Sequence, residues 1–218
     1  MTTSAGAPNP FDAMFASRHT VLRRTDGSAQ QWPVHRWCDT DSAADDLDRQ
    51  FDTLVADRCH GATIDLGCGP GRLVDELVTR RLIALGVDSS TVAVAMARAR
   101  GVTVLHRDIH GPLPGEGRWT TALLIDGNIG IGGAPDRVLS RAAALVRPGG
   151  TVLVEIDPAV EHIEYEEVRV EGDSYASTWF PWARIGLLGA ESLCHGCGLT
   201  ILGTWEHAGR QVVEMIRP

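Results

Sequence analysis

A glycine-rich turn between an apolar run and a helical pattern is the part of this chain best suited to binding a ligand. The turn reads Asp65-x-Gly67-x-Gly69-x-Gly71. Because glycine has no Cβ, its backbone can pass very close to a bound molecule. Asp88 ends the next apolar run, about 20 residues further on, where a carboxylate can accept hydrogen bonds from a ribose. The spacing therefore predicts a site for a nucleotide-like ligand.

One alternative for this turn is a dinucleotide site. Dinucleotide enzymes carry Gly-x-Gly-x-x-Gly, in which the third glycine lets the helix pack against the strand. Gly67 and Gly69 fit the first two positions, but Arg72 occupies the third. A nicotinamide oxidoreductase is therefore the less favoured interpretation.

The elements around the turn alternate between short apolar runs and helical patterns. Apolar strands separated by helices are typical of a parallel sheet that is covered on both faces. The closing segments 199–206 and 211–216 predict an antiparallel hairpin at the sheet edge. We expect an α/β three-layer sandwich with a seven-stranded, mostly parallel sheet. Its strands are predicted at 62–66, 82–87, 102–106, 120–125 and 151–156, and its helices at 70–80, 91–100 and 135–146.

The segments outside this alternation predict additions to the sheet. We expect residues 1–10 to be a disordered lead-in and residues 11–60 to form a lid. The lid would hold a hairpin of 21–24 and 32–37, with its turn at Asp26-Gly27, and a helix over 41–58. A second hairpin at about 160–180 would interrupt the main domain, which spans 61–218, and 183–197 is predicted to be helical.

Composition disfavours several classes of partner. The chain has 218 residues and a net charge of −8, which disfavours nucleic acid because phosphates require Lys and Arg. It holds no apolar run of about 18 residues and no secretory signal, so we expect a cytoplasmic protein away from membranes. The five cysteines are irregularly spaced, as in reduced proteins. Cys194-His195-Gly196-Cys197 is interpreted as a helix end rather than half of a zinc site, and no metal is predicted.

The ordered motifs resemble those of the class I S-adenosylmethionine-dependent methyltransferases, in particular a bacterial subgroup acting on small molecules. The glycine turn resembles motif I of that family, and Asp88 matches the acidic residue after strand two. Further matches are Asp108 after strand three, Asp126-Gly127-Asn128 after strand four, and Arg147-Pro148-Gly149-Gly150 before strand five. The resemblance covers about 62–218 and implies S-adenosylmethionine as the cofactor.

The resemblance also implies roles for individual residues toward that cofactor. Gly67, Gly69 and Gly71 would shape the turn, with the Cys68 backbone near the ribose. Asp65 would orient the amino group and Asp88 the ribose hydroxyls. The remaining cofactor-binding residues implied by the resemblance are Ser89, Asp108, Ile109, Asp126 and Gly127.

Residues for the methyl acceptor are predicted from less specific signals. His35, between Trp32 and Trp37 in the lid, is the preferred general base, and Asp126 is a second candidate catalytic residue. Asp126 and Glu155 lie at the carboxyl ends of strands, where open α/β sheets bind ligands. The residues predicted to line the acceptor pocket are Trp37, Asn128, Glu155, Trp179, Trp182 and Arg184.

The sequence therefore predicts methyl transfer to a small organic molecule through an oxygen, nitrogen or carbon atom that it does not specify. A non-catalytic protein that binds S-adenosylmethionine as a partner or regulator is the alternative. The expected partner is the small-molecule acceptor, and the chain is expected to be a monomer or a homodimer.

Overall fold

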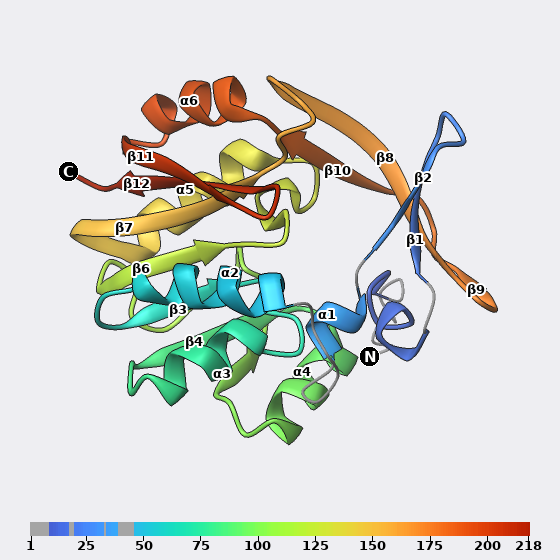
Figure 1. Cartoon of the computed structure of the whole chain (residues 1–218), viewed down its shortest axis with the longest axis horizontal. Helices are drawn as coiled ribbons and strands as arrows, with labels where there is room; N and C mark the ends of the chain where they lie inside the picture. The colour runs from blue at the N-terminus through green and yellow to red at the C-terminus, as the bar shows by residue number, and fades with distance from the viewer. Residues whose placement is uncertain (1–8, 18–19, 33, 39–45) are drawn as a thin grey trace, which may run out of the picture.

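A seven-stranded sheet forms the centre of the part of the chain that the computed structural model describes, residues 9–17, 20–32, 34–38 and 46–218. Its strands are β3 (Thr63–Leu66), β4 (Ala84–Asp88), β5 (Val104–His106), β6 (Trp119–Leu124), β7 (Val146–Ile156), β11 (Thr200–His207) and β12 (Arg210–Ile216). They lie in the order β11-β12-β7-β6-β3-β4-β5 (Figure 1). The strands from β7 to β5 are parallel, while β12 and β11 are antiparallel additions. This confirms the predicted fold class.

Helices cover both faces of this sheet (Figure 1). Apolar side chains of α2 (Asp46–Asp57), α3 (Arg72–Thr79) and α4 (Thr91–Ala99) form one core with the sheet. Those of α5 (Pro135–Leu145) and α6 (Leu187–Gly196) form another on the opposite face. The strands between the two cores are buried on both sides, which is why their sequences are continuously apolar rather than alternating.

Local sequence signals place several element ends where they were predicted. The Oγ of Ser90 accepts a hydrogen bond from the backbone N–H of Ala93 at 3.1 Å, so Ser90 caps the start of α4. Pro135 occupies the first turn of α5, where its missing N–H costs nothing. Helix α6 ends at Gly196 with Cys197 as its C-cap, which confirms the interpretation of the Cys194–Cys197 segment as a helix end.

A second sheet joins the N-terminal hairpin to the predicted insertion. It consists of β1 (Val21–Arg24), β2 (Ala29–Gln31), β8 (Ile163–Gly172), β9 (Tyr175–Ala176) and β10 (Phe180–Ile185). The order is β10-β8-β1-β2, with β9 paired to β8, and Leu22 lies opposite Val170. Its inner face, together with the short helices η1 (Met14–Ala16) and α1 (Val34–Cys38), packs around an aromatic core. The two flanking segments are therefore one structural unit.

Two element predictions are wrong and one lies partly outside the described residues. Val34–Cys38 forms helix α1, whereas a strand was predicted over 32–37. The predicted helix over 183–197 begins only at Leu187, because residues 180–185 pair with β8 as an edge strand that tolerates Pro181. Helix α2 is described from Asp46, and residues 39–45, which hold the predicted start, lie outside the described part.

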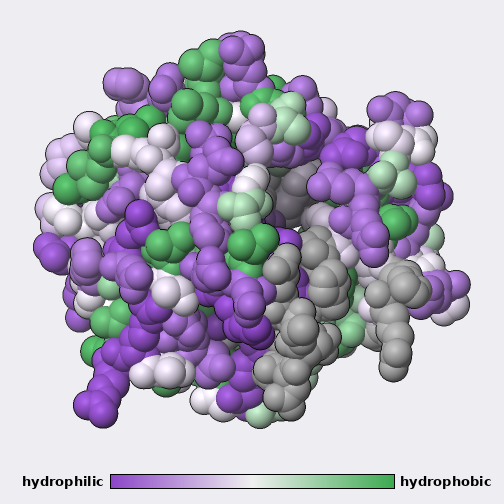
Figure 2. Space-filling model, in the orientation of Figure 1, coloured by the Kyte–Doolittle hydropathy of each residue, from purple (hydrophilic) through white to green (hydrophobic). Residues whose placement is uncertain are grey.

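The surface of the molecule is mainly polar. In the view of Figure 2, hydrophilic residues cover most of the visible face and hydrophobic ones are scattered among them. No helix in the described ranges combines the length and hydropathy that crossing a bilayer requires.

Candidate ligand-binding site

A cavity of about 410 Å³ lies at the carboxyl ends of β3, β4, β5 and β6, beneath the second sheet and η1. Parallel strands bring their carboxyl ends to one edge, so motifs far apart in the chain meet there. Most of the predicted cofactor residues line this cavity, as does Asn128. They are Asp65, Gly67, Cys68, Gly69, Asp88, Ser89, Asp108, Ile109 and Asp126.

The glycines of the turn serve two different purposes. Gly69 has φ +54°, and a Cβ built on it would project into open space, with the Phe15 ring at 3.8 Å as its nearest contact. Gly71 has φ +82°, but its Cβ would lie 2.7 Å from Val102 Cγ2. Gly69 therefore leaves room for a ligand, whereas Gly71, which does not line the cavity, lets α3 pack closely.

Two carboxyl groups, buried Asp65 on β3 and half-buried Asp88 on β4, face the cavity. Asp65 is 3% exposed, and burial, reinforced by Asp126 and Asp88, raises its pKa to about 8. Burial also raises the pKa of Asp88, although its carboxylate accepts backbone hydrogen bonds from Gly69 at 2.8 Å and Ser90 at 2.7 Å. A cationic ligand would stabilise the ionised form of both carboxyl groups.

Replacement of Asp65 should make stability depend differently on pH. The pKa of Asp65 is about 8 in the folded protein and near 3.9 in the unfolded chain. The protonated Asp65 carboxyl group therefore contributes its full stabilisation below the unfolded pKa, and this contribution is lost as pH rises through about 8. Asn cannot ionise, so Asp65→Asn should gain stability over the parent by up to about 1.4 kcal/mol per pH unit within this window. Urea unfolding of both proteins without ligand, between pH 5 and 9, measures the difference.

The exposed Glu206 on β11 offers the matched control, since Glu206→Gln removes a carboxyl group that water solvates. The difference between Asp65→Asn and the parent is compared with that of this variant over the same range. A constant difference for Asp65→Asn would show that Asp65 is ionised throughout.

Aromatic side chains close the cavity on the side of the second sheet. Phe11 stacks on Trp32 with ring centroids 5.8 Å apart, and Trp32 meets Trp182 edge-on at 5.9 Å. Asp12 fixes this segment, because its carboxylate accepts hydrogen bonds from Ser90 Oγ at 2.6 Å and Thr91 Oγ1 at 3.0 Å. Residues 9–17 are therefore held over the cavity by the start of α4, and the rings can exclude water from a bound ligand.

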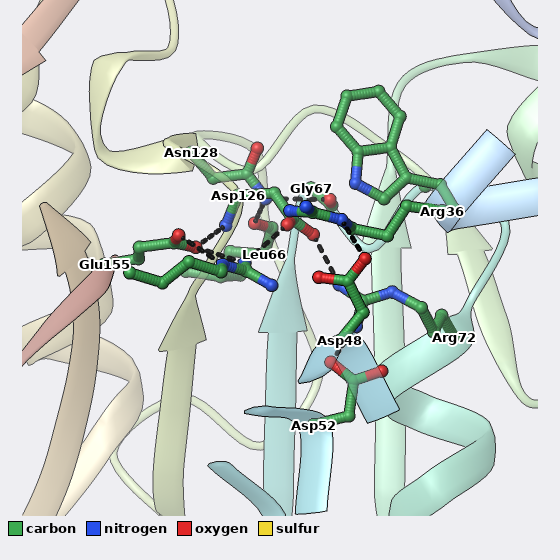
Figure 3. A network of polar contacts seen from close by, with 12 residues as sticks. Arg36, Asp48, Asp52, Leu66, Gly67, Arg72, Asp126, Asn128 and Glu155 are labelled. Carbon is green, nitrogen blue, oxygen red and sulfur yellow. Dashed lines mark hydrogen bonds and ion pairs between the residues drawn. The ribbon is translucent and has the colours of Figure 1, made fainter. Parts of the chain in front are cut away.

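A network of charged side chains lies at the base of the site (Figure 3). Asp126 accepts hydrogen bonds from Arg72 at 2.8 Å and from Arg210 at 2.7 Å, one on each carboxylate oxygen. Arg72 also pairs with Asp52 of α2, and Arg210 pairs with Glu155 of β7. Burial alone would raise the pKa of Asp126, but Arg72, Arg210 and Arg36 lower it to about 2. Asp126 is therefore ionised and weakly basic.

This network holds a strained turn after β6. Asp126 has φ +58° although it is not glycine, and Gly127 follows at +79°. Such a conformation costs about 1–3 kcal/mol and persists where the surroundings enforce it. Glu155 accepts the Asp126 backbone N–H at 2.6 Å, and Asn128 Nδ2 donates to the carbonyl oxygens of Leu66 and Gly67. The turn is thereby tied to both β7 and the glycine turn.

The residues predicted to line the acceptor pocket are divided between two cavities. Trp37 and Trp182 line the cavity and also a second, adjacent cavity of about 240 Å³. Glu155 and Arg184 line only the second cavity, as does Gly127, which was predicted to contact the cofactor.

Two other predictions have different outcomes. Trp179 lines neither cavity: it precedes β10 and is 41% exposed, with the Arg169 guanidinium over its ring. His35 lies in α1, but its side chain is outside the described part of the structure, so its role as a base stays a prediction. The catalytic role of Asp126 also stays a prediction.

Several residues of the site were not found from the sequence. Phe11 and Phe15 reach the cavity from a segment that carries no motif. Arg210 follows the turn between β11 and β12, and no local pattern indicates that it pairs with Asp126, 84 positions earlier. Arg72 was noted only as a departure from the dinucleotide motif, yet its position at the start of α3 lets it reach both Asp52 and Asp126.

The chain matches known proteins along the segment that builds this site. Residues 63–150 match the model of the methyltransferase domain family. The chain is 26% identical over 142 residues to trans-aconitate 2-methyltransferase of Deinococcus radiodurans, covering 63% of this chain and 54% of the relative. It is 30% identical over 134 residues to ubiquinone biosynthesis O-methyltransferase of Methylococcus capsulatus, covering 55% of each. The matches thus span about half the length of these curated relatives.

A solved structure resembles nearly the whole chain. It is a SAM-dependent methyltransferase from Bacteroides fragilis in complex with S-adenosyl-L-homocysteine, with a TM-score of 0.76, 15% identity and coverage of 96% of both chains. The 1,6-didemethyltoxoflavin-N1-methyltransferase of Burkholderia thailandensis gives a TM-score of 0.59 at 16% identity, covering 82% of this chain and 79% of that one. Residues 63–150 therefore resemble a methyltransferase domain, and the chain has the class I methyltransferase fold.

Proposed function

We propose that this protein transfers the methyl group of S-adenosylmethionine to a small organic molecule. The observation that carries the proposal is the convergence of four ordered motifs on one cavity. The glycine turn, Asp88, Asp108 and the Asp126 turn follow four consecutive parallel strands and all face the same space. The matched domain spans these four motifs.

The cavity suits that cofactor in shape and in charge. The open space above Gly69 is room that a side chain would fill. Four aspartates line the cavity (Asp65, Asp88, Asp108 and Asp126), against two arginines (Arg72 and Arg137). S-adenosylmethionine carries a sulfonium and an ammonium group against one carboxylate, so this acidic lining complements its net positive charge.

The residues would divide the work of binding among the parts of the cofactor. Asp65 would receive the ammonium group, Asp88 the ribose hydroxyls, and Asp108 with the Ile109 backbone the adenine. The backbone from Gly67 to Gly69 would pass beneath the ribose and the methionine chain. The strained turn at Asp126 and Gly127 would lie beside the reacting end, where Asn128 fixes its distance from the glycine turn.

The bound cofactor supplies a methyl carbon that an acceptor attacks in line, as the carbon–sulfur bond breaks and the sulfur becomes neutral. The chain's own contribution is alignment and exclusion of water, which can supply about 7–11 kcal/mol of the barrier in favourable cases. The aromatic rings over the cavity, which Asp12 holds in place, are suited to that purpose.

Calorimetric titration of the full chain with S-adenosylmethionine tests the proposal. We expect one site per chain, with thermal stabilisation by the cofactor and none by NAD, because Arg72 replaces the third glycine of the dinucleotide motif. Absence of both heat and stabilisation at millimolar cofactor would contradict the proposal. Binding without formation of S-adenosylhomocysteine with any acceptor would favour the non-catalytic alternative.

A further inference from the structure

The second cavity lies immediately beside the cofactor cavity. It has a volume of about 240 Å³ and is bounded by the ends of β6 and β7, by β10 and by the start of β12. Trp32, Trp37, Trp182 and Asp126 line both cavities, so these side chains form the partition between them. A molecule in the second cavity would therefore lie next to the Asp126 turn, where the methionine end of the cofactor is proposed to bind.

The carboxylates of the second cavity already have hydrogen-bond donors. Both oxygens of Asp126 and both oxygens of Glu155 accept hydrogen bonds, from Arg72, Arg210 and the Asp126 N–H. Asp157 accepts hydrogen bonds from the Ala159 N–H at 2.8 Å and Arg184 Nε at 2.8 Å. An incoming ammonium group would have to compete with these partners.

By contrast, two buried hydrogen-bond donors of the second cavity have no acceptor among the described residues. Arg210 is only 8% exposed, and its Nη1 is buried without an acceptor among the described residues. The buried Nε1 of Trp37 is likewise without an acceptor in the described ranges. A buried donor without an acceptor is unfavourable, and a ligand oxygen would relieve it. Four arginines line the cavity (Arg24, Arg36, Arg184 and Arg210), and the first three pair with Glu166, Asp48 and Asp157 respectively.

We propose that the second cavity binds the methyl acceptor through a carboxylate group, which accepts hydrogen bonds from Arg210 Nη1 and Trp37 Nε1. The rest of the acceptor lies against the indoles of the partition and presents its reacting atom to the first cavity. This assignment rests on the proposed methyl transfer, and it identifies the acceptor as an organic acid rather than an amine.

Three flat probes of similar size test the assignment: benzoate, the neutral benzamide and the cationic benzylamine. Each is titrated into the full chain saturated with S-adenosylhomocysteine, and tryptophan fluorescence is followed. Benzoate should bind at least about tenfold more tightly than either of the others, as expected for a charge-assisted hydrogen bond. Equal or tighter binding of benzamide or benzylamine, or no binding of benzoate at millimolar concentration, overturns it.

The failure of this inference is distinguishable from failure of the proposed function. S-adenosylhomocysteine binding is measured first by calorimetry, and its absence would refute the proposed methyl transfer. Normal S-adenosylhomocysteine binding without a preference for benzoate would refute the carboxylate assignment alone.

Two variants connect the preference to the named donors. Trp37→Phe keeps an aromatic ring but lacks the N–H, and Arg210→Lys keeps a charge for Asp126 and Glu155 but lacks Nη1. In each, the ratio of benzoate to benzamide affinity should fall toward one, a change that general loosening of the fold would not produce. Trp179→Phe, outside both cavities, is the matched control and should leave the ratio unchanged. An unchanged ratio in both donor variants would remove these residues from the assignment.

Discussion

Gly69→Arg should lose binding of S-adenosylmethionine. A side chain at this position would project into the cavity, where the nearest atom, in the Phe15 ring, is 3.8 Å from the Cβ position. An arginine side chain is long enough to fill the space in which the cofactor would lie against the backbone of this turn. We expect the affinity to fall at least about 100-fold, equivalent to about 2.7 kcal/mol, in calorimetric titration of the folded variant.

The control for this variant is Gly101→Arg. Gly101 also has a left-handed backbone, with φ +88°, and its Cβ would have no neighbour within 4 Å, but it lies on the exposed surface away from the cavity. Both variants carry comparable backbone strain, so a difference in binding reports the blocked cavity. If Gly101→Arg lost as much affinity, strain rather than obstruction would be responsible. If Gly69→Arg bound normally, the cofactor would not pass over this turn.

The convergence of the motif residues on the first cavity was predictable because its information is local. Each motif lies within two residues of the end of an apolar strand, as Gly67 follows β3 directly and Asp108 comes two residues after β5. Once the strands are known to be parallel, their carboxyl ends must share an edge. The convergence of Asp65, Asp88 and Asp126 then follows from chain geometry, without knowledge of any side-chain contact.

The second sheet was less predictable because its stability comes from contacts between distant segments. Strand β1 pairs with β8, about 150 residues later, and neither run carries a signal that specifies the other. Val34–Cys38 lies at the end of a hairpin-like pattern, yet it forms a helix whose Val34 enters the aromatic core. Tertiary packing of this kind overrides short-range propensity.

The charged network at the base of the site was also only partly predictable from the sequence. The sequence identified Asp126 and Glu155 as strand-end carboxylates, which is where the structure places them. Their partner Arg210 could not be predicted, because its side chain reaches Glu155 only in the register that β12 adopts against β7, in which Val212 lies opposite Glu155. That partner also changes the chemistry, since a carboxylate held between Arg72 and Arg210 is suited to fixing a turn rather than accepting a proton.

Arg72→Met should therefore destabilise the protein strongly. The Arg72 side chain is 14% exposed and joins Asp52 of α2 to Asp126 beneath the cavity. Methionine retains much of the volume but leaves two largely buried carboxylates with one cation fewer. Removing one partner of a buried ion pair costs about 3–5 kcal/mol. Urea unfolding at neutral pH should show a loss of this size. Cofactor affinity should also fall, because the strained Asp126 turn loses one of its two arginine contacts.

Arg80→Met is the control that tests whether burial of the ion pair, rather than loss of a positive charge alone, causes the destabilisation. Arg80 pairs with Glu76 and Asp57, but its side chain is 26% exposed and that of Asp57 is 56% exposed, so its loss should cost less than about 1 kcal/mol. Adding Asp52→Asn to Arg72→Met should recover part of the stability, since it removes one of the two stranded charges. Equal losses in the two arginine variants would mean that water reaches Asp52 and Asp126 freely. The network would then be an ordinary surface cluster, and the Asp126 turn would need another source of support.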